Sequence, residues 1–228
     1  MKEVILMIKA VLFDFDGTLA DTNPLIIRNF EETFAQMLPE RTFEMSEIID
    51  CIGPTLKQTG ERYFPADVDG FIKTYRKFNA QYHDEMITIY PGVQKMLKAL
   101  KEKGLKLAIV SSKKRELVAQ GLECLDIHGF FDHIIGSDDV VHPKPHPEAI
   151  NQALDYYGLT PEVCLMVGDN SHDIDGAKAA GVESIAVGWA LRGADYLRQF
   201  NPDYIVNDAM EIVKIVDEHL SDGGILDE

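Results

Sequence analysis

The run Ala10-Val-Leu-Phe-Asp14-Phe-Asp16-Gly17-Thr18 contains the first strand and the first polar cluster that the sequence predicts. Its apolar residues indicate a buried strand, which stops at two aspartates separated by one residue. Side chains at i and i+2 of a strand share a face, so a continuing strand would aim both carboxylates at one point. Two carboxylates that close repel each other unless a cation or a shared proton relieves them. An apolar strand leaving a core also often ends in Asp and Gly, so the segment alone leaves a structural interpretation open.

Beyond residue 91 the chain alternates predicted helices and strands. Pro91-Gly92 opens a helix that Gly104 ends, and its apolar residues recur at helical spacing. Strands are predicted at 105–110, 133–136, 163–167 and 184–187, with a further edge strand at 203–206. Helices are predicted at 114–122, 147–157, 173–180 and 209–220. This order predicts an α/β fold with a Rossmann-like parallel sheet covered by helices on both faces. Ligands of such folds bind at the carboxyl ends of the strands.

Residues 20–90 interrupt the alternation. They contain no convincing strand, and helical patterns are found near 24–36, 46–51 and 67–83. We expect an α/β core domain of residues 1–20 and 90–228, with a small helical cap domain, residues 21–89, inserted after the first strand. The edges of this insert, at 21–22 and 89–92, would be the hinges of a lid. The tail, 221–228, is expected to fray.

Composition narrows the range of partners. The chain has 228 residues, of which 22 are Lys or Arg and 38 are Asp or Glu, giving a net charge of −16. This charge disfavours nucleic acid and anionic membranes as partners, and it requires a cation or a local basic cluster for any phosphorylated substrate. Three separated cysteines predict reduced, semi-buried apolar side chains in a cytoplasmic protein. No signal-peptide pattern follows the apolar runs at 4–7 and 10–13, and these runs are too short to span a bilayer.

Four polar sets follow predicted strands or lie in loops: Asp14 with Asp16, Ser111, Lys144, and Asp169 with Asp173. Singly each has an ordinary explanation, as a helix cap, a solvated loop lysine or a turn residue. Together they supply what phosphoryl transfer needs: hard oxygen ligands for a metal, a nucleophile, a cation and hydrogen-bond donors for the phosphoryl oxygens.

These motifs resemble the haloacid dehalogenase (HAD) superfamily of aspartate-nucleophile phosphatases along essentially the whole chain. The matching segments are Asp14-Phe-Asp16-Gly17-Thr18, the Ser111 step, Lys144-Pro-His-Pro-Glu148 and Gly168-Asp-Asn-Ser-His-Asp173. The resemblance implies that Asp14 attacks phosphorus to form an aspartyl-phosphate and that Asp16 is the general acid and base. It also implies a Mg²⁺ site and phosphoryl-binding residues. The expected metal ligands are Asp14, the backbone carbonyl of Asp16, Asp169 and Asp173, the last directly or through water. Ser111, Ser112 and Lys144 would bind the phosphoryl group.

Two features near these motifs have alternative interpretations. Lys113, Lys114 and Arg115 form a basic patch that could steer anions, although exposed helix charges are the favoured interpretation. His142 and His146 suggest zinc, but the intervening prolines exclude a helix-spaced pair and no cysteine is nearby, so metal binding there is disfavoured.

Segments of the insert and of the core resemble one branch of the superfamily, the PpaX-like pyrophosphatases, close kin of phosphoglycolate phosphatases. The resemblance implies a small anionic substrate, either inorganic pyrophosphate or 2-phosphoglycolate. Gly53 and Thr55 would lie in the lid loop that contacts substrate, although a tight turn between helices fits nearly as well. Arg76 and Lys57 are candidate anion contacts, and the alternative for each is a simple surface charge.

Several other functions share part of this pattern. A phosphomutase of the β-phosphoglucomutase type and a generalist sugar-phosphate or nucleotide phosphatase are the nearest alternatives. A phospho-receiver domain has about half this length. A haloacid dehalogenase needs neither an acid at Asp16 nor Mg²⁺, and a non-catalytic protein that kept the fold is disfavoured because every motif residue is present. The sequence leaves the oligomeric state, monomer or dimer, open.

Overall fold

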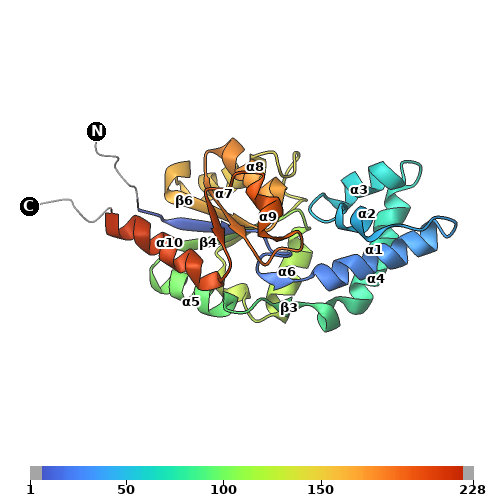
Figure 1. Cartoon of the computed structure of the whole chain (residues 1–228), viewed down its shortest axis with the longest axis horizontal. Helices are drawn as coiled ribbons and strands as arrows, with labels where there is room; N and C mark the ends of the chain where they lie inside the picture. The colour runs from blue at the N-terminus through green and yellow to red at the C-terminus, as the bar shows by residue number, and fades with distance from the viewer. Residues whose placement is uncertain (1–6, 223–228) are drawn as a thin grey trace, which may run out of the picture. The chain divides into compact units, whose positions relative to one another are not determined.

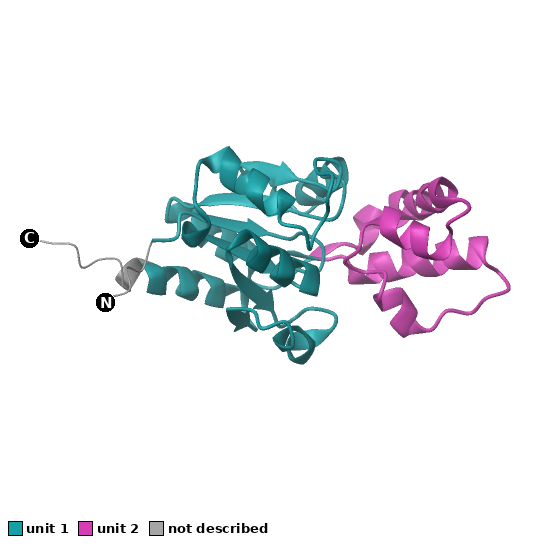
Figure 2. Ribbon diagram, turned by 90° about the horizontal axis from the view of Figure 1, so that it is seen from above, with its two compact units in different colours: residues 1–20, 89–228 teal, residues 21–88 magenta. Residues whose placement is uncertain are grey.

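The computed structural model, which describes residues 7–222, divides the chain into two compact units (Figure 2). Unit 1 comprises Met1–Ala20 and Ile89–Glu228, and unit 2 comprises Asp21–Thr88. The expected domain boundaries differ from these by one residue, because unit 2 ends at Thr88 and the expected cap domain ends at residue 89. At the two crossings lie the short strands β2 (Ala20–Asp21) and β3 (Thr88–Ile89), which pair with each other.

Unit 1 is built on a six-stranded sheet in which every neighbouring pair is parallel. The strand order is β5-β4-β1-β6-β7-β8, so β1 lies near the centre and β8 at an edge, as predicted. The strands are β1 (Ala10–Phe13), β4 (Lys106–Val110), β5 (His133–Ile135), β6 (Cys164–Gly168), β7 (Glu183–Val187) and β8 (Tyr204–Val206). The predicted α/β class with a Rossmann-like parallel sheet is confirmed.

Helices cover both faces of this sheet (Figure 1). Alternate residues of β1 show the division: Val11 and Phe13 belong to one apolar cluster, whereas Ala10 and Leu12 belong to the other. The first cluster includes residues of α5 (Val93–Glu102), α6 (Arg115–Cys124), α9 (Gly193–Arg198) and α10 (Ala209–Asp222). The second includes residues of α7 (Glu148–Tyr157) and α8 (Ser171–Ala180). Two 3₁₀ turns, His128–Phe130 and Pro161–Val163, precede β5 and β6. The sequence patterns missed α9, a six-residue helix whose only buried side chain is Leu197.

Unit 2 consists mainly of four helices around an aromatic core. They are α1 (Asn23–Met37), α2 (Met45–Ile49), α3 (Leu56–Tyr63) and α4 (Val68–Met86). Phe30, Phe34, Phe64, Phe71 and Tyr75 are buried together and make ring contacts with one another. The sequence did not predict α3, because its buried residues are Thr59 and Gly60, which leave no apolar period to detect.

Two sequence expectations are corrected by the structure. Cys51 and Cys164 are buried, and burial raises the pKa of both thiols, but Cys124 is exposed near the end of α6 rather than semi-buried. The tail was expected to fray from residue 221, but α10 continues through Asp222. Residues 223–228 of that tail lie outside the described part. Among the described residues, no helix combines the length and apolar character that crossing a membrane requires.

Candidate active site

The predicted site residues of unit 1 converge at the carboxyl ends of three adjacent strands. Phe13, the last residue of β1, is in register with Ile109 of β4 on one side and Val167 of β6 on the other. Asp14 therefore leaves the sheet between the segments that lead to Ser111 and Asp169. The backbone N–H groups of Asp14 and Ser111 still donate to the neighbouring strands, to Val167 O and Ile135 O, at 2.9 Å each. The sheet thus fixes the backbone beneath these side chains.

Lys144 joins two of the aspartates below the surface. It comes from the loop between β5 and α7, and its side chain is 3% exposed. Its Nζ donates to Asp173 Oδ1 at 2.5 Å and to the carbonyl of Val110 at 2.9 Å. Asp14 Oδ1 lies 3.3 Å from the same nitrogen. The interpretation of Lys144 as a solvated loop lysine is therefore wrong, because the ammonium is buried among acceptors.

Burial is the main electrostatic influence on the acidic cluster. It raises the pKa of Asp14 to about 7, against an opposing effect of Lys144 and with further increases from Asp173 and Asp16. The pKa of Asp169 is also well above its usual value, first through burial and then through the charges of Asp14 and Asp173. For Lys144, burial would lower the pKa, but the charges of Asp14 and Asp173 outweigh it and raise the pKa. The single positive charge of Lys144 does not neutralise the negative charges of the three ionised aspartates.

The donor set fits a hard divalent cation. Oxygens of Asp14, Asp169 and Asp173 lie within 4.8 Å of one another. Asp14 Oδ1 is buried, and its contact with Lys144 Nζ, 3.3 Å away, is an ion pair, so this oxygen keeps lone pairs for a metal ion. Three carboxylates and nearby carbonyls are the oxygen-rich environment that Mg²⁺ prefers. The Asp16 carboxylate is not part of this group, and coordination through the Asp16 backbone carbonyl stays a prediction.

A tight turn after Asp16 brings the backbone against Asp169. Gly17 has φ of +78°, and a Cβ at this position would lie 2.2 Å from Asp169 Oδ2. Thr18 Oγ1 donates to Asp169 Oδ1 at 3.4 Å, and Trp189 Nε1 donates to the Thr18 carbonyl at 3.1 Å. Glycine is required here both by the left-handed backbone and by the space that Asp169 occupies.

Asp16 has a cationic partner that the sequence analysis did not identify. Lys113 Nζ lies 2.9 Å from Asp16 Oδ1, and the two side chains are 12% and 19% exposed. Lys113 precedes α6, which begins at Arg115, so the favoured interpretation of Lys113 as an exposed helix charge is wrong. Its Nζ also lies 5.3 Å from the centre of the Phe15 ring. The available signal was its position two residues after Ser111, in the same loop at the end of a strand.

Ser111 and Ser112 belong to this same loop. Ser111 is buried, and its Oγ accepts a hydrogen bond from the Lys113 backbone N–H at 3.2 Å. It does not cap the next helix, whose N-cap is Lys114. Ser112 is half-buried. The hydroxyl of Ser111 therefore keeps its proton available as a donor at the carboxyl end of β4.

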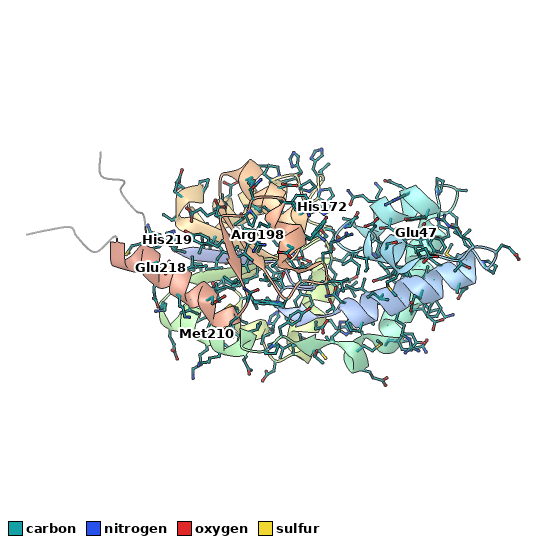
Figure 3. All side chains as sticks on the ribbon, viewed as in Figure 1. Glu47, His172, Arg198, Met210, Glu218 and His219 are labelled. Carbon is teal, nitrogen blue, oxygen red and sulfur yellow. The ribbon has the colours of Figure 1, made fainter. Side chains whose placement is uncertain are left out.

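The start of α8 holds Asp173 in place. Asn170 is the N-cap and its side chain accepts from the His172 N–H, while Asp173 Oδ2 accepts from the Asn170 N–H at 3.0 Å. His172 lies on the first turn of this helix (Figure 3). The capping box explains the position of Asp173 without excluding a second role, because its other oxygen contacts Lys144.

The predicted substrate contacts of unit 2 have local structural roles. Gly53 has φ of +110° in the turn between α2 and α3. Thr55 is the N-cap of α3 and forms a reciprocal capping box with Gln58, as the alternative of a turn between helices requires. Arg76, on α4, is half-buried, and its Nε has no hydrogen-bond partner in the described part of the chain. Lys57 lies 3.8 Å from Glu61 with its side chain 75% exposed, as expected for a surface ion pair.

Comparisons with known proteins show similarity along most of the chain. Residues 11–187 match the family model described as haloacid dehalogenase-like hydrolase. The chain is 45% identical to a pyrophosphatase PpaX of Halalkalibacterium halodurans over 92% of this chain and 97% of that protein. It is 43% identical to a pyrophosphatase PpaX of Oceanobacillus iheyensis, with the same coverage. A solved haloacid dehalogenase-like family hydrolase from Streptococcus pneumoniae is similar at a TM-score of 0.80 and 28% identity, covering 91% of this chain and 98% of that one.

Proposed function

Because the chain belongs to the haloacid dehalogenase-like hydrolases and is a phosphatase of that family, we propose that it hydrolyses inorganic pyrophosphate with Mg²⁺, through a phosphoenzyme at Asp14. Phosphatases of this family generally use a divalent metal. The observation that carries the proposal is the buried group of Asp14, Lys144, Asp169 and Asp173 at the carboxyl ends of β1 and β6. Pyrophosphate is preferred because relatives at 43–45% identity are named pyrophosphatases.

In the first step a carboxylate oxygen of Asp14 attacks one phosphorus of the substrate. The bond from that phosphorus to the bridging oxygen breaks, and the departing phosphate takes a proton from Asp16. Lys144 offsets the negative charge of Asp14 as the anion approaches, and Ser111 donates to a phosphoryl oxygen. Lys113, 2.9 Å from Asp16, holds the acid in position.

In the second step water attacks the phosphorus of the aspartyl-phosphate. Asp16, now ionised, accepts a proton from this water, the bond from phosphorus to Asp14 breaks, and the second phosphate leaves. One residue thus serves as acid and then as base, and the enzyme returns to its starting protonation state. No external oxidant or reductant is needed.

Asp14, Asp169, Asp173 and the carbonyl of Asp16 are the residues that would hold Mg²⁺. When bound, the cation supplies charge neutralisation for the attacking carboxylate and for the phosphoryl oxygens. Burial raises the pKa of Asp14 to about 7, yet Asp14 must be ionised to attack phosphorus. A bound cation would favour the ionised carboxylate. Within unit 2, Gly53, Thr55 and Arg76 remain the proposed substrate contacts.

The proposal is tested by steady-state kinetics with and without Mg²⁺. We expect kcat/KM for pyrophosphate to exceed that for 2-phosphoglycolate and for sugar phosphates, and to vanish in chelator. Asp14→Asn is the control, because it keeps the shape of the side chain but removes the nucleophile. Turnover in this variant equal to wild type would overturn the mechanism. A preference for 2-phosphoglycolate, or for no single substrate, would overturn the substrate, as would conversion of a sugar phosphate to its isomer.

A further inference from the structure

The loop between β5 and α7 carries a second group of potential ligands besides Lys144. His142, His146 and Glu148 each offer one atom, and these three atoms lie within 4.8 Å of one another. The two imidazole rings have their centres 4.6 Å apart. The residues share the loop with the active-site lysine, but they are separate from the aspartates, and Lys144 points into the buried cluster instead.

Glu148 organises this group through the backbone. Its two oxygens accept hydrogen bonds from the N–H groups of Val141, at 2.8 Å, and His142, at 2.9 Å. Its own N–H donates to His146 Nδ1 at 3.3 Å. Prolines at 143, 145 and 147 alternate with these residues and restrict the backbone further. The three side chains therefore start close together, which lowers the ordering cost of binding an ion.

The chemistry of the donors selects a class of cation. The Glu148 carboxylate accepts hydrogen bonds from the N–H groups of Val141 and His142, and its remaining lone pairs are available to a metal ion. His142 Nδ1 lies 2.9 Å from Glu148 Oε2, and the His142 side chain is 62% exposed. Two imidazoles and a carboxylate form a ligand set found in zinc sites, whereas Mg²⁺ prefers oxygen alone.

We propose that His142, His146 and Glu148 form a second cation site, specific for borderline divalent transition metals such as Zn²⁺ and completed by water. Ligands of a tetrahedral zinc ion lie about 3.4 Å apart, since each bond is roughly 2.1 Å long. From the 4.8 Å limit, the three ligand atoms must approach one another by at most about 1.4 Å. His142 is 62% exposed, so rotation of its side chain meets little resistance.

The proposed site contradicts the expectation from the sequence that His142 and His146 do not bind a metal. The prolines do exclude a helix-spaced histidine pair, but they leave a loop in which Glu148, at the first position of α7, gathers both rings. The net charge of −16 favours cation binding in general, and the imidazoles supply the selectivity. The proposal does not rest on the proposed phosphatase chemistry.

Calorimetric titration of the full chain with Zn²⁺, in a large excess of Mg²⁺ to occupy the aspartate site, tests the proposal. We expect one zinc ion to bind to the wild type. Affinity should fall at least tenfold in His142→Asn and in His146→Asn, and binding should be lost in the double variant. His128→Asn is the matched control, because His128 is exposed in a separate turn, and its affinity should equal that of wild type.

A second measurement separates the two metal sites. Zinc should still bind the histidine site of Asp169→Asn with unchanged affinity in the absence of Mg²⁺. Co²⁺ bound to the wild type in excess Mg²⁺ should show visible absorption of a nitrogen-containing site, which the double histidine variant should lose. Mg²⁺-dependent hydrolysis should be unchanged in both single histidine variants. Equal zinc affinity in the wild type and the double variant, or no zinc binding to the wild type in excess Mg²⁺, would overturn the proposal.

Discussion

Lys113 Nζ donates to Asp16 Oδ1 at 2.9 Å, so the proposed general acid is held by an ammonium that comes from the loop after β4. The loop itself is anchored, because Ser137 N–H donates to the Lys113 carbonyl and the Lys113 N–H donates to Ser111 Oγ. The contact therefore links the acid at the end of β1 to the hydroxyl at the end of β4. An anchored partner restricts the positions from which Asp16 can deliver its proton.

Lys113→Met should lower kcat/KM for pyrophosphate by roughly tenfold to a hundredfold, because general acid catalysis contributes about 10²- to 10⁴-fold and positioning is part of it. kcat/KM for p-nitrophenyl phosphate should change far less, since its leaving group departs without a proton. Lys114→Met is the control, because the Lys114 side chain makes no capping hydrogen bond to α6. In this variant kcat/KM should stay at the wild-type level for both substrates. An equal loss for both substrates in Lys113→Met would contradict a role in positioning the acid.

Gly17→Ala should abolish Mg²⁺ binding and hydrolysis together. The new methyl group would stand 2.2 Å from Asp169 Oδ2, so the carboxylate must leave its place, and the backbone at φ +78° is strained as well. Gly104→Ala shares the strain, with φ of +81°, but nothing lies within 4 Å of its Cβ. It should cost roughly 1–2 kcal/mol of stability and leave activity intact. Urea unfolding and Mg²⁺ titration of both variants separate strain from displacement of the ligand.

The strands and the site residues at their ends were predictable for the same reason. Runs such as 107–110 and 164–167 are fully buried on both faces of a parallel sheet, so they are apolar without interruption, and the first polar residue marks where each strand leaves the core. Since parallel strands end at one edge, Asp14, Ser111 and Asp169 had to meet there. The helices of the core were predictable because the residues that face the sheet are apolar and recur at helical spacing.

The features that were missed depend on loop conformation rather than on periodicity. Whether Lys113 reaches Asp16 depends on α6 beginning at Arg115 and not earlier. His142 and His146 come together through bonds from Glu148 to the backbone, which no spacing rule describes. In α3 the buried surface is made by Thr59 and Gly60, so a helix without an apolar stripe escaped detection.

The pKa of Asp14 predicts how stability without metal depends on pH. Its pKa is about 7 in the folded chain, owing first to burial, and near the ordinary aspartate value of 3.8 when the chain is unfolded. The folded state therefore binds more protons between these values, so the contribution of Asp14 to stability is complete below about pH 4 and is lost as pH rises through 7. In chelator, the stability of wild type relative to Asp14→Asn should fall over this interval. Urea unfolding from pH 4 to 8 measures the difference, and a constant difference would refute the assignment.

Mg²⁺ should reverse this loss, because a bound cation stabilises the ionised carboxylates. The Mg²⁺-induced rise in Tm should be larger at pH 8 than at pH 6, where protons compete for Asp14 and Asp169. At a hundredfold excess over Kd, a ligand contributes about 2.7 kcal/mol to stability. Asp169→Asn should lose the rise at both pH values while remaining folded, since it removes one buried charge. A rise that is the same at pH 6 and pH 8 in the wild type would contradict competition with protons.

Thr55 distinguishes a helix cap from a substrate contact. Its Oγ1 accepts from Gln58 N–H at 3.3 Å, and replacement by Ala should cost about 1 kcal/mol of stability through loss of the cap. Thr55→Asp keeps an N-cap acceptor, so stability should be retained, but it adds a negative charge at the proposed contact. If Thr55 meets the substrate, KM for pyrophosphate should rise severalfold in Thr55→Asp with kcat little changed. Gln81→Glu adds the same charge at an exposed position of α4 and should leave KM unaltered. Equal KM values in Thr55→Asp and Gln81→Glu would leave Thr55 with the cap alone and remove it from the substrate site.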